Sequence, residues 1–100
     1  MNNTQVEVLN NVSTVCEYIM INGKNSDFKN VNESVQKLLE DVINNFPKSF
    51  IARFAQLGCL TDGDILAKMD GLLDSWTVQV VLIAVDLYKK CETYKKKLTE

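Results

Sequence analysis

The longest apolar segment of the chain covers residues 76–87, and only three polar residues interrupt it. In a helical register, Gln79 and Asp86 fall on one narrow polar seam, and nearly every other position from 78 to 88 is apolar. A helix with so little polar surface needs protein around it, so the pattern predicts a buried C-terminal helix. The β-branched residues of this segment suggest a strand as the alternative. No other segment alternates apolar and polar residues over enough positions to pair with a strand, which favours the helix.

Four further helices are predicted from apolar residues that recur at intervals of three and four, over residues 4–20, 35–46, 50–57 and 65–76. The first ends at Asn22-Gly23, because a glycine readily adopts the conformation that follows a helix. The second ends before Pro47, the only proline, whose ring excludes the preceding helical turn. The third is expected to stop at Gly58.

A polar loop over residues 23–30 separates the first two helices. Phe28 is the only large apolar side chain of this loop, and we expect it to hold the loop against the core. Asn30 or Asn32 is expected to cap the second helix. The chain is thus predicted to be all-α: a single domain over residues 1–100, in which a compact bundle of about five helices is wrapped around an apolar C-terminal helix.

The start of the fourth helix carries the most specific local signal. Thr61 and Asp64 have the spacing of a capping box, in which the threonine hydroxyl accepts from the third helical amide. Leu60 and Ile65 stand at the positions of a hydrophobic staple. No glycine or proline marks a break near residues 74–75, so it stays open whether the fourth and fifth helices are separate.

Composition is that of one ordinary globular domain. The chain has 100 residues, of which 46% are hydrophobic and 24% charged, and this length allows one core. A formal charge of −2 gives no electrostatic footprint for nucleic acid. The five lysines among residues 89–97 are expected to be a solvated helix end, with Asp86–Lys90 and Glu92–Lys96 as ion pairs. The apolar segment is shorter than the roughly 20 residues that span a bilayer, so no membrane span is expected.

The residue types needed for catalysis are largely missing. There is no histidine, so Ser and Cys lack their usual activating base and metals lack their commonest ligand. The closest carboxylate pairs lie on polar helix faces or at a cap, where solvation is expected. The TDGD segment lacks the glutamate that completes a calcium loop, since Leu73 stands at its twelfth position. We therefore expect no enzyme activity, no catalytic residue, no metal and no cofactor.

Cysteines and sequons bear on the compartment. Cys16, Cys59 and Cys91 are far apart, which argues against zinc and dithiol motifs. Cys16 and Cys91 fall on apolar stripes and are expected to be buried, with Cys59 the most accessible. A secreted chain would bridge two of them or pair with a second chain; a cytosolic one would use them as core residues. The sequence opens without a signal peptide, and sequons at residues 2, 11 and 32 favour a mature secreted protein, with a cytoplasmic one as the alternative.

Two functions fit this sequence. The first is a secreted, non-enzymatic protein that binds a small apolar ligand or lipid in its core, because Phe and Met side chains surround a helix rich in Val, Ile and Ala. The expected ligand-binding residues are Ile19, Leu39, Phe50, Phe54, Met69, Trp76, Val81 and Tyr88. The second is a protein-protein interaction module, intracellular or viral, that uses an exposed helix face or forms a homo- or heterodimer. Ile83 supports the second function, because it falls within the polar seam and is expected to be partly exposed.

Overall fold

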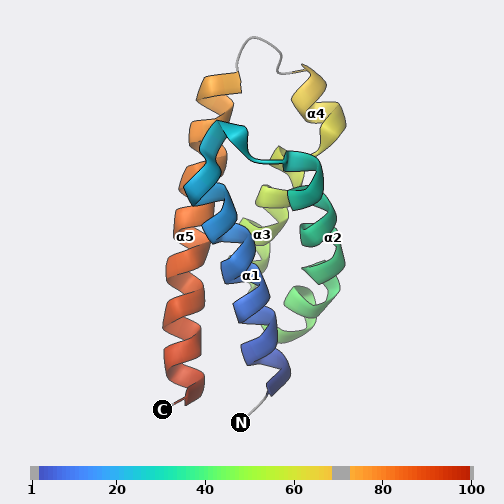
Figure 1. Cartoon of the computed structure of the whole chain (residues 1–100). Coiled ribbons are helices and arrows are strands. Elements are labelled where there is room, and N and C mark those ends of the chain that lie inside the picture. The colour runs from blue at the N-terminus through green and yellow to red at the C-terminus, as the bar shows by residue number, and fades with distance from the viewer. Residues whose placement is uncertain (1–2, 69–72, 100) are drawn as a thin grey trace.

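The computed structural model describes residues 3–68 and 73–99. Within them the chain forms five α-helices and one 3₁₀ turn, and no strand (Figure 1). The elements are α1 (Asn3–Asn22), η1 (Gly23–Asn25), α2 (Phe28–Asn45), α3 (Lys48–Leu60), α4 (Gly63–Lys68) and α5 (Leu73–Thr99). The all-α prediction is confirmed, and the segment over residues 78–85 is helical rather than extended.

The bundle is built from two antiparallel helix pairs. Figure 1 shows α1 beside α5 along most of its length, so that the two ends of the chain lie at the same end of the molecule. Helix α2 packs against α3, and α3 closes the bundle by packing against α5. The result is elongated, with principal extents of 46 × 22 × 20 Å. Helix α4 contacts the end of α3 and lies at the opposite end of the molecule from the termini.

The core follows the apolar stripes of α1 and α2 closely. In α1 the buried side chains recur at intervals of three and four, as the sequence predicts: Val8, Leu9, Val12, Cys16 and Ile19. In α2, Val35 and Val42 are fully buried, but Ile43 is 50% exposed although it belongs to the predicted stripe. The stripe of α2 is therefore narrower than its sequence suggests.

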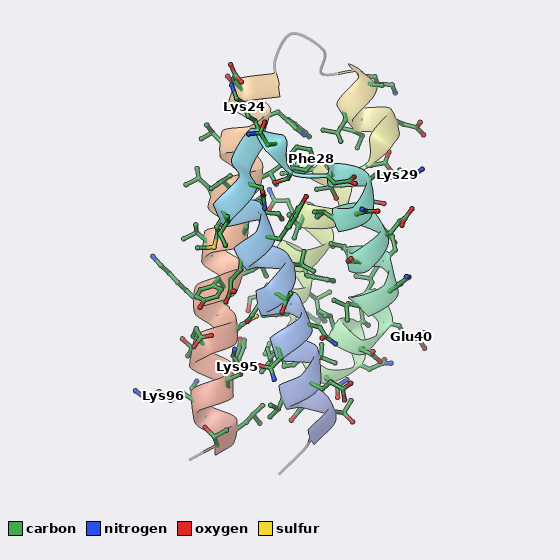
Figure 2. All side chains as sticks on the ribbon, in the orientation of Figure 1. Lys24, Phe28, Lys29, Glu40, Lys95 and Lys96 are labelled. Carbon is green, nitrogen blue, oxygen red and sulfur yellow. The ribbon has the colours of Figure 1, made fainter. Side chains whose placement is uncertain are left out.

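Helix boundaries agree with the sequence at the end of α1 and differ at the start of α2. Gly23 follows α1 with a φ of +52°, the left-handed conformation expected of a helix-stopping glycine. Helix α2 begins at Phe28, inside the predicted loop, and Asp27 is its cap: the Asn30 amide donates to the Asp27 carboxylate at 3.2 Å. The caps predicted at Asn30 and Asn32 are thus wrong. Phe28 itself is buried, at the junction between the turn and α2 (Figure 2).

Helix α3 does not stop at Gly58 but continues to Leu60. A side chain at Gly58 would meet Cγ1 of Val35 at 3.1 Å, so this glycine serves the close approach of α3 to α2. Because α3 is longer than expected, Thr61 lies at its C-terminal end and is fully buried. The Thr61 hydroxyl donates to the Leu57 carbonyl at 2.8 Å and accepts from the side-chain amide of Asn32 at 3.2 Å.

The capping box predicted at Thr61 is therefore wrong. Asp62 caps α4 instead: its carboxylate accepts from the Asp64 amide at 2.9 Å, and its carbonyl accepts from the Leu66 amide. The spacing of Thr61 and Asp64 matches the motif, but the hydroxyl is used by the preceding helix. Residues 74–75, where the sequence leaves a break between the fourth and fifth helices open, lie inside α5, which begins at Leu73, whereas α4 covers Gly63–Lys68.

Helix α5 is enclosed on one side only. Its buried positions are Thr77, Val80, Ile83, Ala84, Leu87 and Cys91, which form one stripe against α1 and α3. On the other side Val78 is 56% and Leu82 is 60% exposed. The bundle is confirmed, but the expectation that it wraps α5 on every side is wrong for this outer side. Ile83, predicted to be partly exposed in the polar seam, is only 5% exposed.

Candidate functional site

The residues predicted to line a ligand cavity lie in the core and around it. Ile19, Phe50 and Phe54 are fully buried. Four others are partly buried and pack against the core: Leu39, Trp76, Val81 and Tyr88. Met69 lies outside the described residues. The aromatic members are also far apart along the bundle, because Phe50 stands at the start of α3 whereas Trp76 reaches its end.

The contacts of these aromatic side chains are those of a packed core. The Phe50 ring lies 5.0 Å from Phe46 and 5.7 Å from Tyr94, measured between ring centroids. Trp76 donates its indole N–H to the carbonyl of Leu60 at 2.8 Å and so satisfies a free acceptor at the end of α3. Leu60 lies ten residues beyond Phe50, which is about 15 Å along the helix. Phe50 and Trp76 therefore lie at opposite ends of α3.

A shallow groove lies between α1 and α2. It has a volume of about 250 Å³ and is lined by Thr14, Val15, Tyr18, Asn30, Val31 and Ser34. It continues along the same two helices as far as Asn11 and Leu38. The Tyr18 hydroxyl accepts from the Asp27 amide at 2.8 Å and so closes one end. None of the predicted ligand-binding residues lines this groove, although Leu39 lines a smaller one between α2 and α3.

The outer side of α5 carries the clearest candidate for an interaction. Val78, Val81, Leu82 and Val85 recur at i, i+3, i+4 and i+7, which is the spacing of one helix face. Val78 and Leu82 are more than half exposed, and Val81 and Val85 are partly buried beside them. We call these four residues the outer face of α5. It lies on the opposite side of the helix from the buried stripe, so the helix is apolar in two directions.

Two large apolar side chains of the neighbouring helix α1 are also exposed. Glu17 of α1 lies near Tyr88 of α5, and its negative charge is the main reason why the pKa of Tyr88 is raised. Because the helices are antiparallel, the turn of α1 that follows Glu17 runs toward the start of α5 (Figure 1). That turn holds Met20, 39% exposed, and Ile21, 81% exposed.

Charged residues stand at the two ends of the outer face. Asp74 lies one turn before Val78, and Lys89 lies one turn after Val85; both are exposed. Neither forms an ion pair with another described residue. By contrast, Asp86 is held by both Arg53 of α3 and Lys90 at 3.0 Å. The predicted Asp86–Lys90 pair is confirmed.

Of the five lysines near the end of α5, Lys90 and Lys95 are partly buried in ion pairs, and the other three are exposed. Glu92 pairs with Lys95 at 2.9 Å, where the sequence predicted Lys96. Lys96 is exposed and points away from the bundle (Figure 2). Lys97 lies over the Tyr94 ring, with its ammonium 5.9 Å from the centroid.

The cysteines lie as their stripes predict. Cys16 and Cys91 are buried, Cys59 is exposed, and all three are free thiols. Burial raises the pKa of Cys91 to about 11, and the neighbouring Ser13 hydroxyl acts in the opposite direction. Burial also raises the pKa of Cys16, and its neighbour Cys91 adds to the effect. The two buried thiols are therefore poor nucleophiles.

Sites of other kinds are not found in the described part of the chain. No three metal-ligating side chains gather within residues 3–68 and 73–99. Over the same ranges, no helix combines the length and apolar character that a bilayer crossing requires. Comparison of the chain with models of protein families, with curated proteins and with solved structures found no match.

Sequence reasoning missed the outer face of α5 because it assigned Val78 and Leu82 to a helix buried on all sides. A signal was present in the way the apolar residues are distributed around the helix axis. Two apolar stripes on opposite sides of one helix need neighbours on both, and a bundle of four other short helices covers one side more easily than two. Within the polar seam Gln79 is exposed, whereas Asp86 is partly buried and pairs with Arg53 of α3.

Proposed function

We propose that this protein is a non-enzymatic helical interaction module that binds a protein partner through the outer face of α5. The observation that carries the proposal is the exposure of Val78 and Leu82, at 56% and 60%, within an apolar stripe of helical spacing. Single exposed aliphatic residues are ordinary on a protein surface. A stripe of four, with Met20 and Ile21 also exposed on the neighbouring helix α1, is the kind of surface that marks an interaction site.

The shape of this face favours a helical partner. A helix that presents apolar residues at i, i+3, i+4 and i+7 is complementary to another helix or to a groove with the same spacing. Covering Val78 and Leu82 would remove their apolar surface from water, which contributes roughly 25 cal/mol for each Å² buried. Because both side chains are already exposed, binding requires no rearrangement of the core.

The test compares two exposed apolar residues on different helices. A photoactivatable side chain at Val78 should crosslink to the partner in the source cells, and mass spectrometry then identifies it. With that partner purified, Leu82→Gln should weaken binding at least about tenfold, because it removes an exposed anchor. The matched control is Ile43→Gln on α2, where the same change is made at a residue that is 50% exposed. Equal effects of the two substitutions, or no effect of either, would show that the face is not the binding site.

Binding of a small apolar ligand or lipid is the second candidate function, and the groove between α1 and α2 supports it. Its volume of about 250 Å³ is close to the lower end of the range for small-molecule sites, and Val15 and Val31 give it apolar walls. Titration with fatty acids, sterols and a hydrophobic fluorophore is the direct test. Ser34→Phe should fill the groove and abolish saturable binding, whereas Ser49→Phe on α3 should not. Absence of saturable binding by the unmodified chain leaves the interaction module.

A further inference from the structure

We infer that the partner of the outer face of α5 is a second copy of this chain, bound through an antiparallel pairing of the two α5 helices. The inference rests on the proposed function and deepens it. It is carried by a symmetry in the positions of the exposed residues. The apolar and charged side chains of the face are arranged about one point on the helix, midway between Val81 and Leu82.

The four apolar residues of the outer face are placed symmetrically about this midpoint. Val81 and Leu82 stand next to the midpoint on either side of it, and Val78 and Val85 lie equally far from it. In a two-fold antiparallel pair centred there, Val78 of one copy lies opposite Val85 of the other. Val81 likewise lies opposite Leu82. Because a two-fold interface uses the same patch on both copies, such a self-matching pattern is what it requires.

The charged part of the symmetry favours the same partner and direction. Asp74 and Lys89 lie equally far from the midpoint, each about 11 Å along the helix, and they carry opposite charges. An antiparallel pair therefore places Asp74 of each copy opposite Lys89 of the other, twice in one dimer. A parallel pair would place like charges opposite one another at both ends, which disfavours association. Both side chains are exposed, and neither has an ion pair among the described residues.

The surroundings of the face leave room for this pairing. Helix α1 flanks α5 on the side of Tyr88, and α3 flanks it on the side of Asp86, so the direction between them is uncovered. Met20 and Ile21 of α1 are exposed as well. The four residues of the face are fewer than the 20–30 that each side of a standard interface contributes, so the association is weak and reversible.

The experiment is a charge exchange, followed by sedimentation of the full chain at about 10 μM to 1 mM. The unmodified chain should show a monomer–dimer equilibrium in this range. Asp74→Lys and Lys89→Asp should each lower the association constant at least about fivefold, because each places two like charges opposite one another in the dimer. The double variant D74K/K89D should return to within about twofold of the unmodified chain, because the opposite charges face each other again.

The double variant also separates pairing from folding. Asp74 suits the positive end of the α5 dipole, and Asp74→Lys loses that contribution in the single and the double variant alike. Recovery in the double variant therefore reports contact between copies. The matched controls are Lys37→Asp and Asp41→Lys, which exchange exposed charges on α2 and should leave association unchanged.

The outcomes distinguish this inference from the proposed function. A chain that stays monomeric up to about 1 mM, or a double variant no better than the singles, overturns the pairing of two copies. If Leu82→Gln still weakens binding of a different crosslinked protein, the interaction module stands with another partner. If the chain neither self-associates nor depends on Leu82 for binding, both are wrong.

Discussion

Thr61 shows how one hydroxyl can be assigned to the wrong helix. Its spacing from Asp64 is that of a capping box, yet its hydroxyl donates to the Leu57 carbonyl at 2.8 Å. The same oxygen accepts from Asn32 at 3.2 Å, and the Asn32 amide also donates to the Gly58 carbonyl at 2.8 Å. Thr61 thus links the end of α3 to the first turns of α2. The spacing alone does not show where the preceding helix ends.

Thr61→Val tests this link. The substitution keeps the shape of the side chain but leaves the Asn32 amide with one acceptor fewer, so we expect a loss of about 1–2 kcal/mol in the free energy of unfolding. Thr93→Val is the matched control, because the exposed Thr93 hydroxyl also donates to the carbonyl four residues earlier. Urea unfolding of both variants provides the measurement. A loss at Thr93 as large as at Thr61 would contradict the role of burial.

The cysteines give a second expectation at the level of single residues. Cys59 is exposed, whereas burial raises the pKa of Cys16 and Cys91 and leaves little reactive thiolate at neutral pH. Alkylation of the native protein at pH 7.5, followed by mass spectrometry, should modify Cys59 at least about tenfold faster than the other two. Labelling in denaturant, where the three rates should become similar, is the control. Rapid modification of Cys16 in the native state would show that α1 and α5 open readily.

At the scale of elements, the narrow stripes were predictable and the wide one was not. The stripe of α1 leaves one direction for the core, and Val12, Cys16 and Ile19 are all fully buried as expected. In α5 the apolar residues occupy two sides, so periodicity identifies the helix without showing which side meets the bundle. The direction is set by partners distant in the sequence, among them Arg53 on Asp86 and Glu17 on Tyr88.

The two sides of α5 should respond differently to a charge. Val81→Asp or Val85→Asp should be tolerated, because both side chains are only partly buried and belong to the outer face. Ile83→Asp should prevent folding, since a carboxylate at a site 5% exposed loses its hydration without a partner. Circular dichroism and thermal melting distinguish these outcomes. Folding of Ile83→Asp with unchanged melting would mean that α5 faces the bundle with another side.

The candidate site was only partly predictable for the same reason. A protein-interaction module was one of two functions that fit the sequence, but Ile83, the residue chosen to support it, is buried. Val78 and Leu82, which are exposed, were grouped with the core because they belong to the same apolar run as Val80 and Ala84, which are fully buried. Telling these pairs apart requires the positions of α1 and α3, which the apolar pattern does not contain.

At the scale of the whole molecule, association of two copies should raise the free energy of unfolding. Only folded chains present the outer face of α5, so pairing of two copies draws the equilibrium toward the folded form. Raising the protein to about tenfold above the dissociation constant adds about 1 kcal/mol per chain, which corresponds to roughly 4–8 °C in melting temperature for a domain of this size. Calorimetry over a hundredfold range of concentration should therefore show a rising melting temperature. This dependence of the melting temperature on concentration should vanish in Leu82→Gln, which alters the outer face. It should persist in Ile43→Gln, because Ile43 lies on α2. A melting temperature independent of concentration in the unmodified chain, or the same slope in Leu82→Gln, would rule out pairing through this face.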